Sequence, residues 1–373
     1  MANPLAIVNG DGDRTHALVV IFLRGAADGL HMVPAVEDGN YFNSRPRIAV
    51  AKRDAIPLNG FFALHPLLQP LKAIWDDKQL AIVHAAGSED DTRSHFEAQD
   101  LMEHGGVAAG GWLGRFLRLQ SRPVASALQA VALSTHFPEV LRGAPAATVL
   151  ESLDDFSLGE KTEKLTRQLA RLYGARTDDL AAAGRTTIES LGKIERMRAM
   201  PYQPERGAEY GANHFGHSLA QVARLIKARV GLEAASVDLD GWDSHFAQNT
   251  VMDPRMANLA KGLRAFYTDL GREMEHTTVV VMTEFGRRLT ENTSFGTDHG
   301  RGGVMFLMGG GICGGRMIGK WPGLAEASLV GPGDLEVVNN YRNVLAPILL
   351  KLGVGESMRA VFPDFEIEPL AIY

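Results

Sequence analysis

The stretch Ala17-Leu-Val-Val-Ile-Phe-Leu23, followed by Arg24-Gly-Ala-Ala-Asp-Gly-Leu30, decides the fold class of this 373-residue chain. Its first half is an unbroken run of β-branched and large apolar residues, which is typical of a strand that is covered on both faces of a sheet. Its second half is a polar, glycine-containing turn. We therefore predict a buried strand with one carboxylate, Asp28, just beyond its carboxyl end.

The rest of the chain alternates between strand-like and helix-like segments. Further strands are expected at Gln79–Ala85, Leu128–Ser134, Ala235–Asp240, Thr277–Thr283 and Gly303–Met308. Helices are expected at Pro66–Asp77, His95–His104, Asn213–Val230, Pro254–Glu275 and Tyr341–Leu352. Strands that alternate with helices indicate an α/β fold, with a mostly parallel central sheet and helices on both of its faces.

No internal repeat or linker divides the chain, so we expect residues 1–373 to form one α/β domain. Within it, residues 155–230 are mainly helical in pattern, with Leu165, Leu169 and Leu172 at the spacing of one helix face. This block is interpreted either as a helical layer that covers the sheet or as a lid over an active site.

Composition excludes several classes of protein. The formal net charge of −6 argues against nucleic-acid binding, which normally requires a basic face. A single cysteine, Cys313, excludes an intrachain disulfide framework and any multi-cysteine metal site. No apolar run reaches the ~18–20 residues of a membrane span. The first 16 residues show no signal-peptide pattern. A removed signal would leave the same picture, so periplasmic and cytoplasmic locations both stay open, as does the oligomeric state.

Two glycine-rich segments match the residue spacing of nucleotide-binding motifs but lack the other features that nucleotide binding requires. Gly309–Gly314 has the G-x-G-x-x-G spacing and follows a predicted strand, but no helical pattern comes after it to receive a pyrophosphate. Gly314–Lys320 has the spacing of a P-loop, but Trp321 stands where a Ser or Thr would bind Mg²⁺. We reject both interpretations.

Four polar clusters stand where apolar strands are expected to end. Each contains carboxylate, imidazole or guanidinium groups beside small residues: Arg24–Gly29, Arg93–Glu97, Asp240–His245, and Thr283–Arg287 with Gly296–Arg301. Ligands of parallel α/β sheets gather beyond the carboxyl ends of the strands, so we expect these clusters to converge in space. A single Asp–His pair at a strand end is usually a surface loop; the presence of four clusters favours a functional site.

The clusters are rich in Asp and His, which suit a divalent metal ion when thiolates are absent. Asp243 and His245 are two residues apart, so in an extended segment both side chains point the same way. Asp298 and His299 are adjacent and require a bent loop to converge, for which neighbouring glycines provide the freedom.

Ser94 has two interpretations. As the N-cap of the helix that begins at His95, with Glu97 three residues later, it matches a capping box. Its hydroxyl could instead be a nucleophile that is activated by a metal ion, with the helix N-terminus attracting an anionic ester.

The motifs resemble those of the DUF1501 family, in order, from about residue 17 to residue 352. The matching segments are Leu23–Leu30, Arg93–Ala98, Gly111–Arg115, Gly241–His245, Glu284–Arg287, Gly296–Arg301 and Tyr341-Arg342. The family is grouped with the alkaline phosphatase and sulfatase superfamily. That grouping implies a central sheet with helices on both faces, one or two divalent metal ions, and a Ser, Thr or modified Cys nucleophile.

The resemblance implies roles for individual residues. Asp28 resembles the first metal aspartate of the superfamily, and Ser94, or failing it Thr92, lies where its nucleophile would be. Asp243 and His245 resemble its Asp–His ligand pair. Glu284 follows a strand that usually ends in Asp-His, and Phe285 replaces that histidine, which His299 could supply together with Asp298.

We therefore hypothesise a metal-dependent hydrolase of phosphate or sulfate esters, whose partner is a small anionic ester substrate. The ion, which could be Zn, Mn, Mg or Ca, would activate Ser94 or a water molecule. The predicted metal ligands are Asp28, Asp243, His245, Glu284, Asp298 and His299. The residues predicted to clamp the ester oxygens are Arg24, Arg93, Arg287 and Arg301.

Two other interpretations stay open. A catalytically degenerate member of the superfamily would bind an anionic ligand or a partner protein, which is favoured by Phe285 and by Asn340 at a position where the family usually has Asp. The last is an esterase that uses Ser94 and His95 without metal, although adjacent residues at a helix start rarely face each other.

Overall fold

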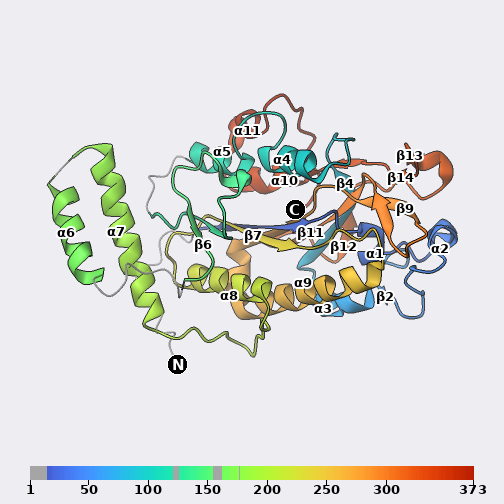
Figure 1. Ribbon diagram of the computed structural model, residues 1–373, viewed down its shortest axis with the longest axis horizontal. Coiled ribbons are helices and arrows are strands. Elements are labelled where there is room, and N and C mark those ends of the chain that lie inside the picture. Colours follow the sequence, from blue (N-terminus) through green and yellow to red (C-terminus); the bar gives the residue numbers. More distant parts are fainter. Residues whose placement is uncertain (1–14, 121–125, 154–161, 176) are drawn as a thin grey trace.

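The predicted first strand forms β1 (Ala17–Arg24), which lies inside a nine-stranded sheet. The structure is a computed structural model that describes residues 15–120, 126–153, 162–175 and 177–373 (Figure 1). Alternate side chains of β1 enter two different hydrophobic cores, because successive residues of a strand point to opposite faces. Ile21 packs into the core on one face of the sheet, and Val20 packs into the core on the other.

The fold class is the predicted one, a mixed α/β fold with a mostly parallel central sheet. The main path of strands is, in spatial order, β12 (Arg316–Ile318), β4 (Leu80–Gly87), β11 (Gly303–Gly309), β8 (Thr277–Met282), β1, β7 (Ala234–Asp240), β5 (Ala130–Leu133) and β6 (Thr148–Leu150). β15 (Asn339–Asn340) pairs with β4 at its carboxyl end. Only β11 runs antiparallel to its neighbours in this sheet, so the carboxyl ends of β1, β4, β7 and β8 share one edge.

Helices cover both faces of the sheet, as Figure 1 shows. The helices on one face are α3 (Gln69–Asp76), α8 (His214–Lys227) and α9 (Gln248–Leu270). Those on the other are α4 (His95–His104), α5 (Trp112–Leu119), α10 (Tyr341–Lys351) and α11 (Met358–Val361). In the part of the chain that is described, no helix is both long and apolar enough to cross a membrane.

Shorter elements complete the fold around the sheet. Small strands form a second sheet in the order β10 (Thr297–His299), β9 (Arg287–Glu291), β14 (Asp334–Leu335) and β13 (Leu329–Val330), and a separate pair, β2 (Ile56–Pro57) with β3 (Ala63–Leu64). The short helices are α1 (Gly29–Met32), α2 (Gly39–Ser44), η1 (Pro66–Leu68), η2 (Glu139–Leu141), η3 (Gly271–His276), η4 (Glu326–Ser328) and η5 (Gly355–Ser357).

One predicted helix has a different start. α9 begins at Gln248, six residues before the predicted start at Pro254, which lies inside the helix. The backbone N–H of Gln248 donates to the carbonyl of Phe295, 2.8 Å away, so a distant loop satisfies a donor in the first turn. Pro254 is the seventh residue of α9 and has no N–H to donate to the carbonyl four residues earlier, so the sequence alone favours a helix that starts at the proline rather than before it. The local sequence therefore did not reveal this boundary.

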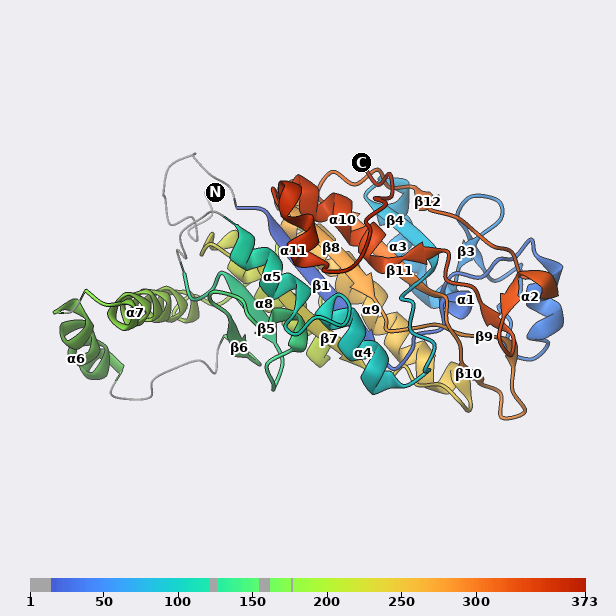
Figure 2. The ribbon, with the colours of Figure 1, turned by 90° about the horizontal axis from the view of Figure 1, so that it is seen from above.

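The helical block over residues 155–230 divides into two parts. α6 (Thr162–Gly174) and α7 (Asp179–Arg198) form a hairpin that projects beyond β6, whereas α8 lies against the sheet. In Figures 1 and 2 the hairpin is at the opposite end of the molecule from β9. Only the last turns of α7, with Ile194 and Met197, join the core. Residues 155–161 and 176 of the block lie outside the described residues.

The glycine-rich segment at residues 309–314 is a turn between β11 and β12, with no helix after it. This confirms that it lacks the helix N-terminus on which a dinucleotide would be bound.

The turn after β8 requires glycine at position 286. A Cβ atom there would lie 1.9 Å from the carbonyl oxygen of Gly302. We expect Gly286→Ala to lower the free energy of unfolding by about 1–3 kcal/mol or more, because the two backbone segments would have to separate. Urea unfolding followed by circular dichroism measures this. Gly39→Ala is the control, since nothing lies within 4 Å of its Cβ position, and its effect should stay within about 0.5 kcal/mol. Equal midpoints for the two variants would contradict the close approach.

Candidate metal centre

Side chains from the predicted polar clusters meet beyond the carboxyl ends of β1, β7 and β8. These strands are parallel and in register, with Arg24 opposite Asp240, so the segments that leave them run side by side. The backbone N–H of Gly25 donates to the Glu284 carboxylate at 2.9 Å. The Arg287 guanidinium donates to the Asp243 carboxylate at 2.6 Å. The topology of the sheet thus brings together residues that are as far apart in the sequence as Gly25 and Glu284, which are separated by 259 positions.

His95 is oriented by Glu284. Its Nδ1 lies 2.8 Å from Oε1 of Glu284, and its ring stacks on Phe285 with the centroids 5.1 Å apart. The other nitrogen, Nε2, is buried and has no hydrogen-bond partner, and it lies 3.7 Å from the Asp243 carboxylate. A carboxylate on one nitrogen fixes the tautomer and leaves a lone pair on the other, which is how metal-binding histidines are commonly held.

Glu284 is a buried, ionised acceptor. Its Oε1 also accepts from the Gln99 amide at 2.9 Å, and its Oε2 accepts from the Thr283 hydroxyl at 2.9 Å. Burial alone would raise the pKa of Glu284, but the hydrogen bonds from His95, Gln99 and the backbone outweigh it and lower the pKa. The structure therefore places this predicted ligand behind His95.

His245 and His299 face each other across the cluster. Their Nε2 atoms are 2.9 Å apart, and the same two atoms lie 3.3 and 3.5 Å from Oδ1 of Asp243. Nδ1 of His299 lies 2.9 Å from the carbonyl oxygen of Arg93, which favours a proton on Nδ1 and a free lone pair on Nε2. Burial and the nearby Arg287 lower the pKa of His299, so the ring is neutral at physiological pH.

Asp243 is the carboxylate at the centre of this arrangement. One ligand atom from each of His95, Asp243 and His299 lies within 4.8 Å of the others. Although burial raises it, the pKa of Asp243 is lowered overall by Arg287 and by the surrounding histidines. Imidazole and carboxylate in this combination suit zinc and similar transition metals better than Mg²⁺ or Ca²⁺.

Asp298 lies behind His245 rather than beside Asp243. Its Oδ1 is 3.3 Å from Nδ1 of His245 and accepts from the Asn292 amide at 3.1 Å. That amide is the main cause of the lowered pKa of Asp298. The relation of Asp298 to His245 repeats the relation of Glu284 to His95.

Asp28 lies apart from the histidines. It is fully buried, and its carboxylate pairs with Arg45 at 2.6 Å and accepts from the Gln248 amide at 2.9 Å. The same carboxylate caps α1 through the N–H groups of Leu30 and His31. Its predicted role as a metal ligand is not supported by a contact with the cluster around Asp243.

The predicted clamp arginines all have protein partners. Arg24 pairs with Glu103 at 3.3 Å and with Asp238 at 3.0 Å. Arg93 pairs with Asp334 at 2.6 Å. The remaining guanidinium contacts are from Arg301 to the carbonyl of Glu89 at 3.3 Å, and from Arg287 to the carbonyls of Gly25, Ala26 and Thr297 at 2.7, 2.8 and 3.0 Å.

Ser94 is the N-cap of α4, which confirms its structural interpretation. Its hydroxyl accepts from the Glu97 N–H over a long 3.5 Å. In a complete capping box the Glu97 side chain would accept from the Ser94 N–H. Here the Ser94 N–H donates to the Thr92 hydroxyl at 3.2 Å instead. The nucleophilic role of Ser94 stays a prediction.

Gln99 is a site residue that the sequence interpretation did not single out. It lies one helical turn after His95, donates to Glu284 and accepts from Arg24 at 3.1 Å. The i, i+4, i+8 spacing of His95, Gln99 and Glu103 on one face of α4 is the signal that could have identified it.

The fold and the site define a class, namely a mostly parallel α/β protein with histidine and carboxylate side chains gathered at the strand ends. A family model described as a protein of unknown function (DUF1501) matches residues 81–358. The chain belongs to the DUF1501 family. No curated protein matches it.

Several solved structures are remotely similar in shape. The C-terminal periplasmic domain of EcEptC from Escherichia coli, in complex with Zn, has a TM-score of 0.36 at 10% identity, over 80% of this chain and 73% of that one. The PH0037 protein from Pyrococcus horikoshii has a TM-score of 0.35 at 12% identity, over 93% and 97%. Alkaline phosphatase from the Antarctic bacterium TAB5 has a TM-score of 0.31 at 10% identity, over 79% and 92%.

The Asp28–Arg45 pair should act as a structural element. Replacing Asp28 by Asn leaves a buried, uncompensated guanidinium, so we expect the free energy of unfolding to fall by about 3–5 kcal/mol at neutral pH. Burial raises the pKa of Asp28, but Arg45 outweighs burial and lowers it below the ordinary 3.8. The stabilisation is therefore present above that value and is lost as the pH falls below it, so the difference between wild type and variant should shrink in acid.

Urea unfolding at pH 7 and pH 3, with and without a chelator, measures this. Glu37→Gln is the control, because Glu37 forms an exposed ion pair with Lys52 that contributes about 0–1 kcal/mol. If chelation alone removed the difference between wild type and Asp28→Asn, Asp28 would act through a bound metal and the structural role would be wrong.

Proposed function

We propose that His95, Asp243, His245 and His299 bind a divalent metal ion, which serves the hydrolysis of a small phosphate or sulfate ester. The observation that carries the proposal is the buried Nε2 of His95, which has no hydrogen-bond partner in the described part of the chain and lies close to Asp243 and His299. A buried nitrogen without a partner is costly and requires an explanation. A metal ion bound among these side chains would provide one.

The donor set fits an ion of the zinc class. Such an ion, when bound, lowers the pKa of a water ligand and polarises an ester oxygen. The protein contributes orientation: Glu284 holds His95, the Arg93 carbonyl holds His299, and Arg287 holds Asp243. Because a second residue orients each of these three side chains, they need to move little when substrate binds.

Two features support an anionic ester as the substrate. His95 is the first residue of α4, so the positive end of a ten-residue helix points into the cluster and favours negative charge. The motifs at these positions also resemble those of the alkaline phosphatase and sulfatase superfamily.

We favour water over Ser94 as the nucleophile. The Ser94 hydroxyl caps α4 by accepting from the Glu97 N–H, so it is engaged in the structure of the helix start. A water molecule held by the ion needs no further residue for its activation.

Substitutions of the ligands should remove metal and activity together. We expect Asp243→Asn and His299→Ala to lower bound metal and the turnover of p-nitrophenyl phosphate or sulfate at least 100-fold. Metal is measured by mass spectrometry of the purified protein, and turnover is measured with added Zn²⁺, Mn²⁺, Mg²⁺ or Ca²⁺. His136→Ala is the control, since His136 is an exposed loop residue, and it should behave as wild type. Absence of bound metal in the wild-type protein under all these conditions would refute the proposal.

Ser94→Ala separates the two nucleophiles. If water attacks, we expect turnover within about threefold of wild type and a loss of about 1 kcal/mol of stability from the missing cap. A loss of turnover with metal retained would assign the nucleophile to Ser94 instead.

Glu284→Gln should weaken metal binding about 10–100-fold, because it removes the negative charge that orients His95.

A binding function is the second candidate. The engagement of Arg24 and Arg287 by carboxylates and carbonyls favours it, since an ester clamp would have to give up these partners. In that case the metal-loaded protein would bind inorganic phosphate or sulfate in calorimetry and turn over neither ester.

A further inference from the structure

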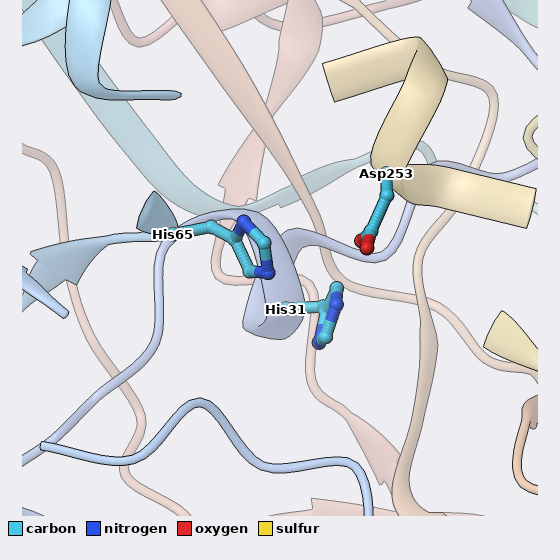
Figure 3. Close-up of side chains that lie close together, drawn as sticks. All are labelled: His31, His65 and Asp253. Atoms are coloured by element: carbon cyan, nitrogen blue, oxygen red, sulfur yellow. The ribbon is translucent and has the colours of Figure 1, made fainter. Parts of the chain in front are cut away.

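A second set of metal-ligand side chains shares no residue with the cluster around Asp243. His31 belongs to α1, His65 caps η1, and Asp253 lies in the second turn of α9. Figure 3 shows the Asp253 carboxylate directed from α9 toward His31, and one ring nitrogen of His65 facing the same space. One ligand atom from each residue lies within 4.8 Å of the other two.

The side chain of His31 is buried and has no hydrogen-bond partner among the described residues. The residue is 1% exposed, and both of its ring nitrogens are buried and without a hydrogen-bond partner. Oδ1 of Asp253 is in the same condition. A neutral imidazole has one donor and one acceptor, so a ring with neither satisfied loses the hydrogen bonds that water would give it. Three unpartnered polar atoms in one place point to a missing ligand.

We propose that His31, His65 and Asp253 form a second metal site, which binds a transition-metal ion of the zinc class. Two imidazoles and one carboxylate are a donor set that zinc binds in proteins, with water completing the tetrahedron. Imidazole disfavours Mg²⁺ and Ca²⁺, which prefer oxygen. Burial lowers the pKa of His31 to about 3 and of His65 to about 4, so both rings are in the unprotonated form that metals require.

Binding requires small local changes. Ligands about 2 Å from a tetrahedral ion lie roughly 3.3 Å from one another, so the three side chains must close in from their present separation. Nδ1 of His65 accepts from the Leu67 N–H at 3.2 Å, and coordination through Nε2 would move the ring proton to Nδ1 and release that bond. The released N–H lies in the first turn of η1, where water can take it.

The site would brace the segment that carries the first cluster of polar residues. His31 follows Asp28 by three positions, and Asp28 is bound to Arg45 and to Gln248 at the start of α9. An ion on His31, His65 and Asp253 would add a second link between α1 and α9 and would join η1 to both. Because it binds only the folded chain, it would stabilise the protein in proportion to its affinity and concentration.

Stoichiometry of Co²⁺ and Zn²⁺ binding tests this proposal on the full chain. The metal-free protein is titrated with Co²⁺ and followed by visible absorption, and Zn²⁺ equivalents are counted after gel filtration. We expect Asp253→Asn and His65→Gln each to lose one equivalent, or to bind it at least 10-fold more weakly. His217→Gln is the matched control, because His217 lies on α8 outside both clusters.

The cluster around Asp243 provides the independent arm. Asp243→Asn with His299→Ala should abolish only the other equivalent, and Zn²⁺ should still raise the thermal midpoint of that double variant. Failure of the proposed function would leave this second equivalent in place. Asp253→Asn exchanges one carboxylate oxygen for an NH₂ group at a half-buried position, so the change in the fold should be small. His65→Gln is a second variant, which keeps the test possible if Asp253→Asn folds poorly. Unchanged equivalents and affinity in both variants, or no metal retained by the double variant, would overturn the site.

Discussion

The hydrogen bonds of the buried Arg287 guanidinium hold together the segments that follow the central strands. The guanidinium is fully enclosed and donates to carbonyls at the exit of β1 and in β10, and to the carboxylate that follows β7. Removing such a charge from water is costly, and only a complete set of acceptors offsets the cost. The guanidinium therefore holds Gly25, Thr297 and Asp243 in one arrangement, and His245 and His299 lie within two residues of Asp243 and Thr297.

The acidic residues at the strand ends differ in their burial and in their hydrogen-bond partners, and these differences limit what each carboxylate can bind. Glu284 is wholly buried and accepts from four donors, so it can orient His95 but has little room to do more. Asp243 is half exposed and is approached by three imidazoles, so it can take part in binding. Asp28 is neutralised by Arg45 and links α1 to α9. Three carboxylates at equivalent strand exits thus differ in their partners: Glu284 contacts His95, Asp243 faces imidazoles at the surface, and Asp28 pairs with Arg45 in the interior.

The two clusters of His and Asp side chains differ in their exposure to solvent. In the cluster around Asp243, the side chains of Asp243 and His245 are partly exposed. In the other cluster, His31 and His65 are buried and Asp253 is partly buried. Asp28 links the start of α1 to α9 through Gln248, so an ion bound by His31, His65 and Asp253 would further limit movement of α1 relative to α9.

The sequence by itself determined the α/β class, most of the helices and strands, and the convergence of the polar clusters. These follow from local patterns and from one rule, that parallel strands leave a sheet at the same edge. It did not determine that α9 starts at Gln248, because a contact with residue 295 satisfies that turn. Only the tertiary structure decided that Glu284 lies behind His95 and that Asp28 pairs with Arg45, since carboxylates at strand exits look alike until their partners are known. His31, His65 and Asp253 belong to no local motif, because three distant segments meet only after the core has packed.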